Sequence, residues 1–325
     1  MSETLLEVKD LKTYFDTDLG VVKAVNGVSF SVAKGQTVGI VGESGCGKSM
    51  MSMSVMKLLP KNGRVAGGHI IFKGQDITGY TKEQMNKING KEISIIFQEP
   101  MTSLNPVFTV GYQIAETLIF HEHLSKSQAR KSSIEMIDRV GIPRAADIFN
   151  AYPHELSGGM RQRIMIAMAL ACRPELLIAD EPTTALDVTI QAQILDLLRK
   201  MKDDFGMSIM MITHDLGVIA EMAEYVVVMY AGRIVERGPV LDIFKHPSHP
   251  YTIGLLRSKP QLHERRDRLY SIPGQVPNLI GLPDQCHFYD RCDRHGPECL
   301  KGFPRETEVG PGHFVACTAF EGEHK

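Results

Sequence analysis

The chain has 325 residues, of which 43% are hydrophobic and 23% are charged, and its formal net charge at pH 7 is -2. This composition is that of a globular protein with material for one large core and a smaller appended unit. It excludes a broad basic surface that would hold a nucleic acid by its phosphates, so we expect no nucleic-acid partner.

No stretch of the sequence approaches the roughly 20 apolar residues that a membrane-spanning helix requires. The first ten residues also lack the basic-then-apolar order of a secretory signal. We therefore expect the chain to remain in the cytoplasm.

The first part of the chain predicts strands. Short apolar alternation covers Leu5–Val8 and Ala24–Val32, and Thr37–Val41 is a compact run of β-prone residues. The third run ends at a glycine-rich loop, Gly42–Ser49, with the sequence G-E-S-G-C-G-K-S. A helix-compatible stretch follows, so the order is strand, loop and helix.

This loop matches the phosphate-binding pattern G-x-x-x-x-G-K-[ST] in the structural context that the pattern requires. Its glycines let backbone N–H groups turn toward phosphate oxygens, Lys48 reaches the β- and γ-phosphates, and Ser49 can bind Mg²⁺. Cys46 is interpreted as a small residue that fits the loop. We expect ATP to contact Gly42, Ser44, Gly45, Cys46, Gly47, Lys48, Ser49 and Met50.

The middle of the chain alternates strands with helical segments. Lys91–Phe97 predicts a strand and Val110–Arg139 a half-buried helical segment. Leu176–Ala179 and Ser208–Thr213 are short apolar runs, as in buried strands of a parallel sheet, and the helical pattern Val188–Lys202 separates them. We therefore expect an α/β nucleotide-binding core with a mixed sheet and a helical subdomain at about residues 100–165.

Asp180 directly follows the buried run Leu176–Ala179. An acidic residue at a strand end is what a phosphate-bound Mg²⁺ needs, so Asp180 and the loop together predict nucleotide binding.

A second motif, L-S-G-G-M-R-Q at Leu156–Gln162, places a serine cap and two glycines before a helical stretch. In this position, just upstream of Asp180, it resembles the signature sequence of the ATP-binding cassette family. The sequence resembles that family at four further places, namely Gln98, Glu181, the turn Ala185–Asp187, and His214 after an apolar strand.

The resemblance, which covers Leu5 to about Gly238, implies a role for each matching residue. Tyr14 would stack on adenine, with neighbouring Phe15 as the alternative. Gln98 would contact Mg²⁺ or the attacking water, Glu181 would polarise that water, and His214 would hold the γ-phosphate. The Mg²⁺ ligands would be Ser49, Gln98 and Asp180.

In this family the signature residues of one cassette, here Ser157, Gly158 and Gly159, close over the nucleotide bound by a second cassette. The resemblance therefore implies a head-to-tail pair with ATP at the seam, whose closed state ATP favours and hydrolysis loosens.

Three further segments resemble the ATPase subunits of bacterial dipeptide and oligopeptide importers. They are Gln98–Pro106, His249–Thr252 with Leu255 and Leu256, and Ile272–Pro277. That family pairs two different cassettes beneath two membrane permease subunits, and a separate solute-binding protein delivers the solute. The resemblance implies a peripheral ATPase at the cytoplasmic face of the inner membrane that is mainly monomeric and weakly active when isolated.

Other cassette proteins are alternatives. Nickel importers share much of this pattern. DNA-repair ATPases insert a long coiled coil and translation factors carry two cassettes in one chain, and the sequence shows neither feature.

After Gly238 the sequence becomes rich in proline, which predicts a boundary between about Lys245 and Pro260. We expect a nucleotide-binding domain at 1–250 and a C-terminal extension at 251–325. The extension contains four cysteines in the spacing C-x5-C-x6-C-x17-C, at Cys286, Cys292, Cys299 and Cys317.

In a reducing compartment these cysteines indicate a metal site, and the spacing leaves Zn²⁺ and a [4Fe–4S] cluster open. His287, His295 and His313 are close enough in sequence to substitute as ligands. Similar cysteine sets in the peptide-importer ATPases are associated with an iron–sulfur cluster, so the resemblance favours a structural [4Fe–4S] cluster, with zinc as the alternative.

Overall fold

The computed structural model describes residues 3–98, 103–184, 186–258 and 270–321. These residues form two compact units. The first comprises Gly79–Met211 with two short pieces from the N-terminal part, and the second comprises Thr4–Val32, Thr37–Thr78 and the chain from Ile212 onward.

The second unit contains a four-stranded sheet in the order β2-β1-β4-β5. Its strands are β1 (Thr4–Thr17), β2 (Gly20–Ala33), β4 (Gly63–Phe72) and β5 (Gln75–Asp76). β4 runs antiparallel to both β1 and β5. The two predicted strands at the N-terminus thus lie within strands that are longer than their apolar alternation indicates.

The same unit contains strands in the order β11-β12-β10-β9-β3. They are β3 (Thr37–Val41), β9 (Tyr225–Tyr230), β10 (Arg233–Pro239), β11 (Glu306–Gly310) and β12 (His313–Ala316). β3 and β9 are parallel, and the other pairs are antiparallel. The sheet is therefore mixed, as predicted, and the C-terminal hairpin β11–β12 extends it.

In the first unit, β6 (Ile93–Ile96) pairs in parallel with β7 (Leu176–Asp180). β8 (Ser208–Ile212) lies next to β7. Every residue of β7 and β8 is buried, because a strand covered on both faces has no solvent side. The strands predicted from these short apolar runs are confirmed.

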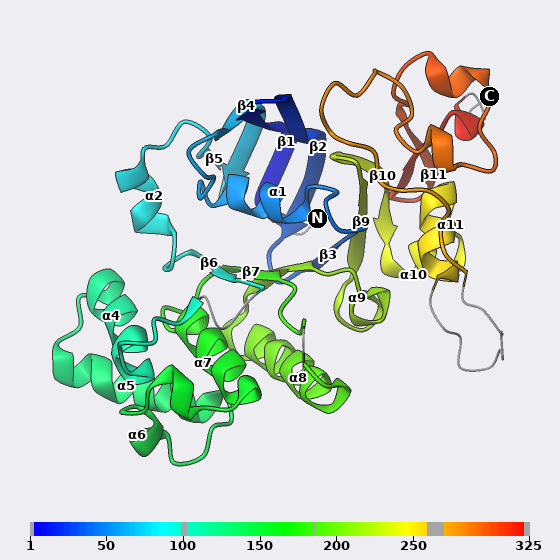
Figure 1. Cartoon of the computed structure of the whole chain (residues 1–325). Helices are drawn as coiled ribbons and strands as arrows, with labels where there is room; N and C mark the ends of the chain where they lie inside the picture. Colours follow the sequence, from blue (N-terminus) through cyan, green and yellow to red (C-terminus); the bar gives the residue numbers. More distant parts are fainter. Residues whose placement is uncertain (1–2, 99–102, 185, 259–269, 322–325) are drawn as a thin grey trace. The chain divides into compact units, whose positions relative to one another are not determined.

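The helical insert of the first unit packs α4 (Val110–Glu122), α5 (Lys126–Arg139), α6 (Ala145–Ile148) and α7 (Gly158–Leu170) against one another (Figure 1). The single helical stretch expected at Val110–Arg139 is two helices. The break occurs because His123 is left-handed, with φ 54°, and Ser125 starts α5 by accepting the N–H of Gln128.

The other described helices connect these elements. They are α1 (Lys48–Val55), α2 (Lys82–Ile88), α8 (Val188–Phe205), α9 (Leu216–Met222), α10 (Val240–Lys245) and α11 (Pro250–Arg257), with 3-10 turns at Pro153–Glu155, Tyr289–Arg291, Pro297–Leu300 and Thr318–Phe320. None of the described helices has the length and apolar character needed to cross a bilayer.

A buried polar network fastens the C-terminal part of the second unit. The carboxylate of Glu236 on β10 is fully buried and accepts the backbone N–H groups of Ser248 and His249. It also lies 2.8 Å from Nε2 of His313 on β12. Because a buried carboxylate needs several partners, these contacts fix β12 and the start of α11 against β10.

Candidate nucleotide-binding site

The phosphate loop follows β3 directly, and α1 begins at its lysine. Gly42 and Gly47 have φ values of 153° and 100°, which favour glycine. A Cβ at Gly42 would lie 2.2 Å from the carbonyl oxygen of Met229, and one at Gly47 would lie 2.1 Å from that of Ala24. These two positions therefore exclude every side chain.

Lys48 is 6% exposed. Its Nζ donates to the carbonyl oxygens of Gly42 at 2.7 Å and Glu43 at 3.0 Å, and it lies 3.8 Å from Sγ of Cys46. Burial raises the pKa of the Cys46 thiol, so this thiol stays protonated. The loop thus presents one held cation and one neutral, close-packed cysteine.

His214 lies near the start of this loop. It lines a pocket of about 440 Å³ together with Val41, Gly42 and Glu43. The strand that precedes it is held beside β3, because the N–H of Thr213 donates to the carbonyl oxygen of Ile40 at 3.2 Å. The structure therefore brings His214 and the start of the phosphate loop together.

Tyr14 is connected to the phosphate loop through a short series of hydrogen bonds. Its hydroxyl donates to the side chain of Asn26 at 2.9 Å, and the N–H of Asn26 donates to the carbonyl of Gly232. The N–H of Gly232 in turn donates to the carbonyl of Cys46. Tyr14 is half-buried, whereas the buried ring of Phe15 packs against Gly63, so Tyr14 is the more available of the two rings.

Gln98, Asp180, Glu181 and the signature residues belong to the first unit, where Gln98 and Glu181 are in contact. Nε2 of Gln98 donates to Oε2 of Glu181 at 3.0 Å, and the hydroxyl of Thr184 donates to the same oxygen at 2.7 Å. Glu181 has φ 49°, a left-handed conformation that costs a residue with a side chain about 1–3 kcal/mol. Strain of this kind is concentrated at functional positions.

Asp180 ends β7 and is 5% exposed, next to Glu181. Two carboxylates therefore follow one buried strand, as the sequence predicts. Residues 99–102, within the predicted segment Gln98–Pro106, and Ala185 lie outside the described residues.

The signature motif starts α7. Ser157 caps the helix by accepting the N–H of Met160 at 3.3 Å. Ser157 and Gly158 are exposed, and a Cβ at Gly158 would meet nothing within 4 Å. The helix N-terminus is therefore open and able to bind an anion.

Gln162 was given no role in the sequence-based prediction. It is 2% exposed, and its Nε2 donates to the carbonyl oxygen of Pro182 at 2.6 Å. This bond ties the signature helix to the segment that follows Glu181. Neither periodicity nor composition marks such a contact between distant parts of the chain.

The four C-terminal cysteines are free thiols, and they lie close enough to influence one another's charge. One of them, Cys292, accepts the backbone N–H of Arg294 at 3.4 Å. Burial raises the pKa of Cys286 to about 11 and raises those of Cys292 and Cys317.

Within the described part of the chain, no three His, Cys, Asp or Glu side chains are arranged to hold a metal ion. The three histidines considered as substitute ligands make other contacts. His313 binds Glu236, whereas Nδ1 of His287 and of His295 lies within hydrogen-bond distance of the carbonyl oxygens of Ala231 and Cys292.

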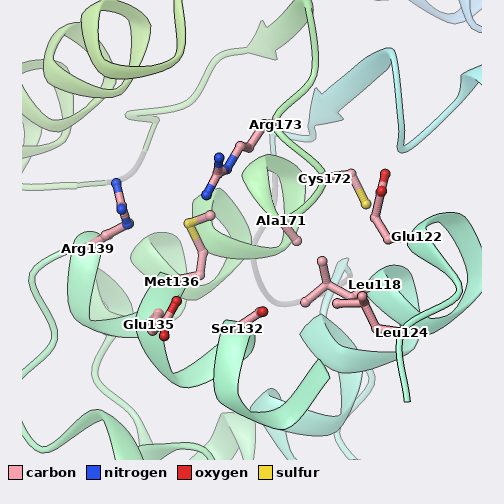
Figure 2. Close-up of a pocket in the computed structure, with 10 residues that line it drawn as sticks. All are labelled: Leu118, Glu122, Leu124, Ser132, Glu135, Met136, Arg139, Ala171, Cys172 and Arg173. Atoms are coloured by element: carbon pink, nitrogen blue, oxygen red, sulfur yellow. The ribbon is translucent and has the colours of Figure 1, made fainter. Parts of the chain in front are cut away.

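A separate pocket of about 280 Å³ lies in the helical insert, between α4, α5 and the segment after α7 (Figure 2). It contains none of the predicted nucleotide-binding residues. Its lining combines two acidic and two basic side chains with apolar ones: Leu118, Glu122, Leu124, Ser132, Glu135, Met136, Arg139, Ala171, Cys172 and Arg173. Burial raises the pKa of Cys172 to about 11, so it contributes a neutral thiol.

Comparison with known proteins connects both units to one family. The family model described as ABC transporter matches residues 25–184, and the model described as Oligopeptide/dipeptide transporter, C-terminal region, matches residues 235–299. The oligopeptide transport ATP-binding protein AppD of Bacillus subtilis is 50% identical over 321 residues, which cover 98% of each chain. OppD of Escherichia coli is 50% identical over 97% of this chain and 93% of its own.

Solved structures share the fold. A dimeric ATP-binding cassette in a post-hydrolysis state, bound to ADP and Pi, is 26% identical and superposes with a TM-score of 0.66. The match covers 72% of this chain and 98% of that one. The predicted α/β cassette fold is confirmed.

Replacing Lys48 by alanine is expected to weaken ATP binding by about 10- to 100-fold, since a hydrogen bond to a charged group contributes about 1.5–3 kcal/mol. Titration calorimetry with Mg-ATP on the full-length chain measures this. Lys61→Ala, which removes an exposed lysine beyond α1, is the matched control. Equal ATP affinity in Lys48→Ala and the control would refute the assignment of the phosphate site.

Replacing Glu181 by glutamine is expected to preserve ATP binding and to slow steady-state hydrolysis by about 100-fold or more. The amide keeps the shape of the side chain and an oxygen that accepts from Gln98 and Thr184, but it is not a base. Turnover is measured in the assembled complex, with Glu83→Gln as the control at an exposed carboxylate. Near-normal hydrolysis would place the catalytic base elsewhere.

Proposed function

Because this chain belongs to the ABC transporter family of ATP-binding proteins, we propose that it is the ATP-hydrolysing subunit of an importer that moves dipeptides or oligopeptides across the bacterial inner membrane. The observation that carries this proposal is the identity of about 50% over nearly the whole chain with oligopeptide transport ATP-binding proteins. The likeness includes the C-terminal part, which the oligopeptide/dipeptide model matches.

The proposed site residues form two groups: those of the second unit bind the nucleotide, and those of the first unit act on water and Mg²⁺. In the second unit, the phosphate loop with Lys48 holds the triphosphate, Tyr14 stacks on adenine and His214 contacts the γ-phosphate. The held position of Lys48 and the pocket that His214 shares with Gly42 support these roles.

In the first unit, Glu181 orients and polarises the attacking water, and Gln98 sits beside it. Their hydrogen bond and the strained backbone of Glu181 support this pair. Asp180 and Gln98 are Mg²⁺ ligands in this unit, and Ser49 is a Mg²⁺ ligand in the phosphate loop, since each supplies an oxygen of the kind that Mg²⁺ prefers.

A second cassette completes the nucleotide site. Ser157, Gly158 and Gly159 present an open helix N-terminus, which is suited to the phosphates of a nucleotide held by another cassette. Two similar solved cassette structures, both of one protein, are dimeric. We expect the partner cassette to be a non-identical chain.

The helical insert supplies a surface for the membrane subunits. Several large apolar side chains on and before α4 are exposed: Val107, Phe108, Tyr112, Ile119 and Phe120. The rings of Phe108 and Tyr112 stack at 5.1 Å. Exposed apolar surface of this kind marks a protein interface, and a short apolar helix from a membrane permease subunit is the occupant that a peripheral transporter ATPase requires.

The chain divides functionally near residue 250. Residues 1–250 form the nucleotide-binding domain, in which about residues 100–165 form the helical subdomain, and residues 251–325 form the C-terminal extension. The change to proline-rich sequence after Gly238 supports this boundary.

We further propose that Cys286, Cys292, Cys299 and Cys317 hold a [4Fe–4S] cluster, with Zn²⁺ as the alternative. The mutual proximity of the four thiols supports this. The N–H of Arg294, which donates to Cys292, supports it too, because such a hydrogen bond stabilises a thiolate. When bound, the cluster supplies a four-point cross-link of the extension.

Anaerobic purification is expected to give a coloured protein with about four iron and four sulfide per chain. Visible absorption, iron and sulfide analysis check this, with the variant Cys286→Ser expected to lose the signal and Cys172→Ser to keep it. Stoichiometric zinc without iron or acid-labile sulfide would overturn the cluster and leave the cysteines as ligands.

The transport role is tested in cells that lack the chromosomal gene. A tagged wild-type chain is expected to co-purify from membranes with two permease subunits and a second, non-identical cassette, and to restore uptake of a labelled dipeptide or oligopeptide. The variant Phe120→Asp should still bind ATP but lose recovery with the membrane, because a charge is placed on the apolar face of α4. Co-purification without permeases would contradict the proposal, and recovery of nickel uptake instead of peptide uptake would change its solute.

A further inference from the structure

Glu43, in the phosphate loop, makes hydrogen bonds to two residues outside the loop. The backbone N–H of Glu43 donates to the hydroxyl of Tyr251 on α11 at 2.7 Å. Its carboxylate accepts two hydrogen bonds from Arg291, at 2.6 and 3.0 Å. Both partners come from the C-terminal part of the chain, more than 200 positions away.

The guanidinium of Arg291 is held by hydrogen bonds on every side. Its side chain is 5% exposed, and besides Glu43 it donates to the hydroxyl of Tyr230 and to the carbonyl oxygens of Ile272 and Pro273. These contacts use all three of its nitrogens. A guanidinium held in this way has one orientation, so it can define the position of the carboxylate that it binds.

The surroundings of Arg291 are equally well packed. The ring of Phe288 lies 5.2 Å from that of Tyr230 and 5.4 Å from that of Tyr251, and the guanidinium lies over the rings of Tyr230 and Phe288 at 5.7 and 5.8 Å. Phe288 and Arg291 both belong to the segment between Cys286 and Cys292. This segment therefore provides both the apolar and the charged contact beside the loop.

The carbonyl oxygen of Glu43 accepts from Lys48, so Glu43 joins the lysine of the phosphate loop to Arg291. We propose that Arg291 is a positioning residue that holds the phosphate loop through Glu43 and makes nucleotide affinity depend on the folded segment 286–292. This inference rests on the proposed binding of ATP at the loop. It assigns the C-terminal cysteine segment a part in nucleotide binding without any contact to the nucleotide.

The variant Glu43→Gln separates positioning from simple electrostatics. Removing a negative charge near a bound triphosphate should strengthen ATP binding if only charge matters. If positioning matters, the amide nitrogen of glutamine faces a guanidinium donor, the paired geometry is lost, and binding weakens. We expect about tenfold weaker ATP binding, within the usual range for coupling between sites.

Arg291→Met and the double variant Glu43→Gln/Arg291→Met complete a double-mutant cycle with Glu43→Gln. Each single variant is expected to weaken ATP binding about tenfold, and the double variant no further, because both changes remove the same link. Arg291→Lys keeps the charge without the planar fork, so its affinity should fall between wild type and Arg291→Met.

The matched control is Arg237→Met. Arg237 on β10 makes an equally two-pronged pair with Glu306 on β11, at 3.0 and 2.8 Å, in the same part of the chain but away from the phosphate loop. Titration calorimetry with Mg-ATP on each full-length variant, with circular dichroism to verify folding, should give a wild-type dissociation constant for Arg237→Met. An equal loss in this control would overturn the proposal in favour of general destabilisation.

Unchanged or tighter ATP binding by folded Glu43→Gln would also overturn it. If Arg291→Met does not fold, the Glu43→Gln variant alone still tests the proposal. Glu43 is partly exposed, and replacing it leaves the buried Arg291 in place. Failure of the wild-type chain to bind ATP, or an unaffected Lys48→Ala, would instead refute the proposed function. The two failures are therefore distinguishable.

Discussion

The closeness of the phosphate loop to its neighbours is the constraint on which the second unit depends. Gly42 lies against the carbonyl of Met229 on β9, and Gly47 lies against that of Ala24 on β2. No side chain fits at either contact, so the loop is seated on backbone that belongs to two different sheets. Lys48 donates to the carbonyl oxygen of Gly42 in this loop, and Gly42 also lines the pocket that contains His214.

In the first unit, the main constraint is the position of the Glu181 carboxylate at the end of β7. Buried β7 delivers Asp180 and Glu181, and the left-handed backbone of Glu181 turns its side chain to meet Gln98 and Thr184. The bond from Gln162 to Pro182 then ties the signature helix to the same segment. The start of α7 and the carboxylates at the end of β7 are thus joined through one short stretch of chain.

Local pattern predicts the parts of this protein that local chemistry determines. The run Thr37–Val41 and the loop after it are visible in sequence because burial and glycine leave a signature. The break at His123 was missed, since one left-handed residue hardly alters an apolar period. The contact between Glu43 and Arg291 was missed for another reason: 248 positions separate the two residues, and a single sequence carries no sign of such pairing.

That separation also bears on how the chain is made. The phosphate loop is synthesised before both of its outside supports, because Tyr251 and Arg291 follow Glu43 by 208 and 248 residues. At about 5–20 residues per second the delay is on the order of 10 to 50 seconds. During this interval the nascent loop lacks its two outside supports, so the phosphate loop is fully held only after Arg291 has been synthesised and has folded against it.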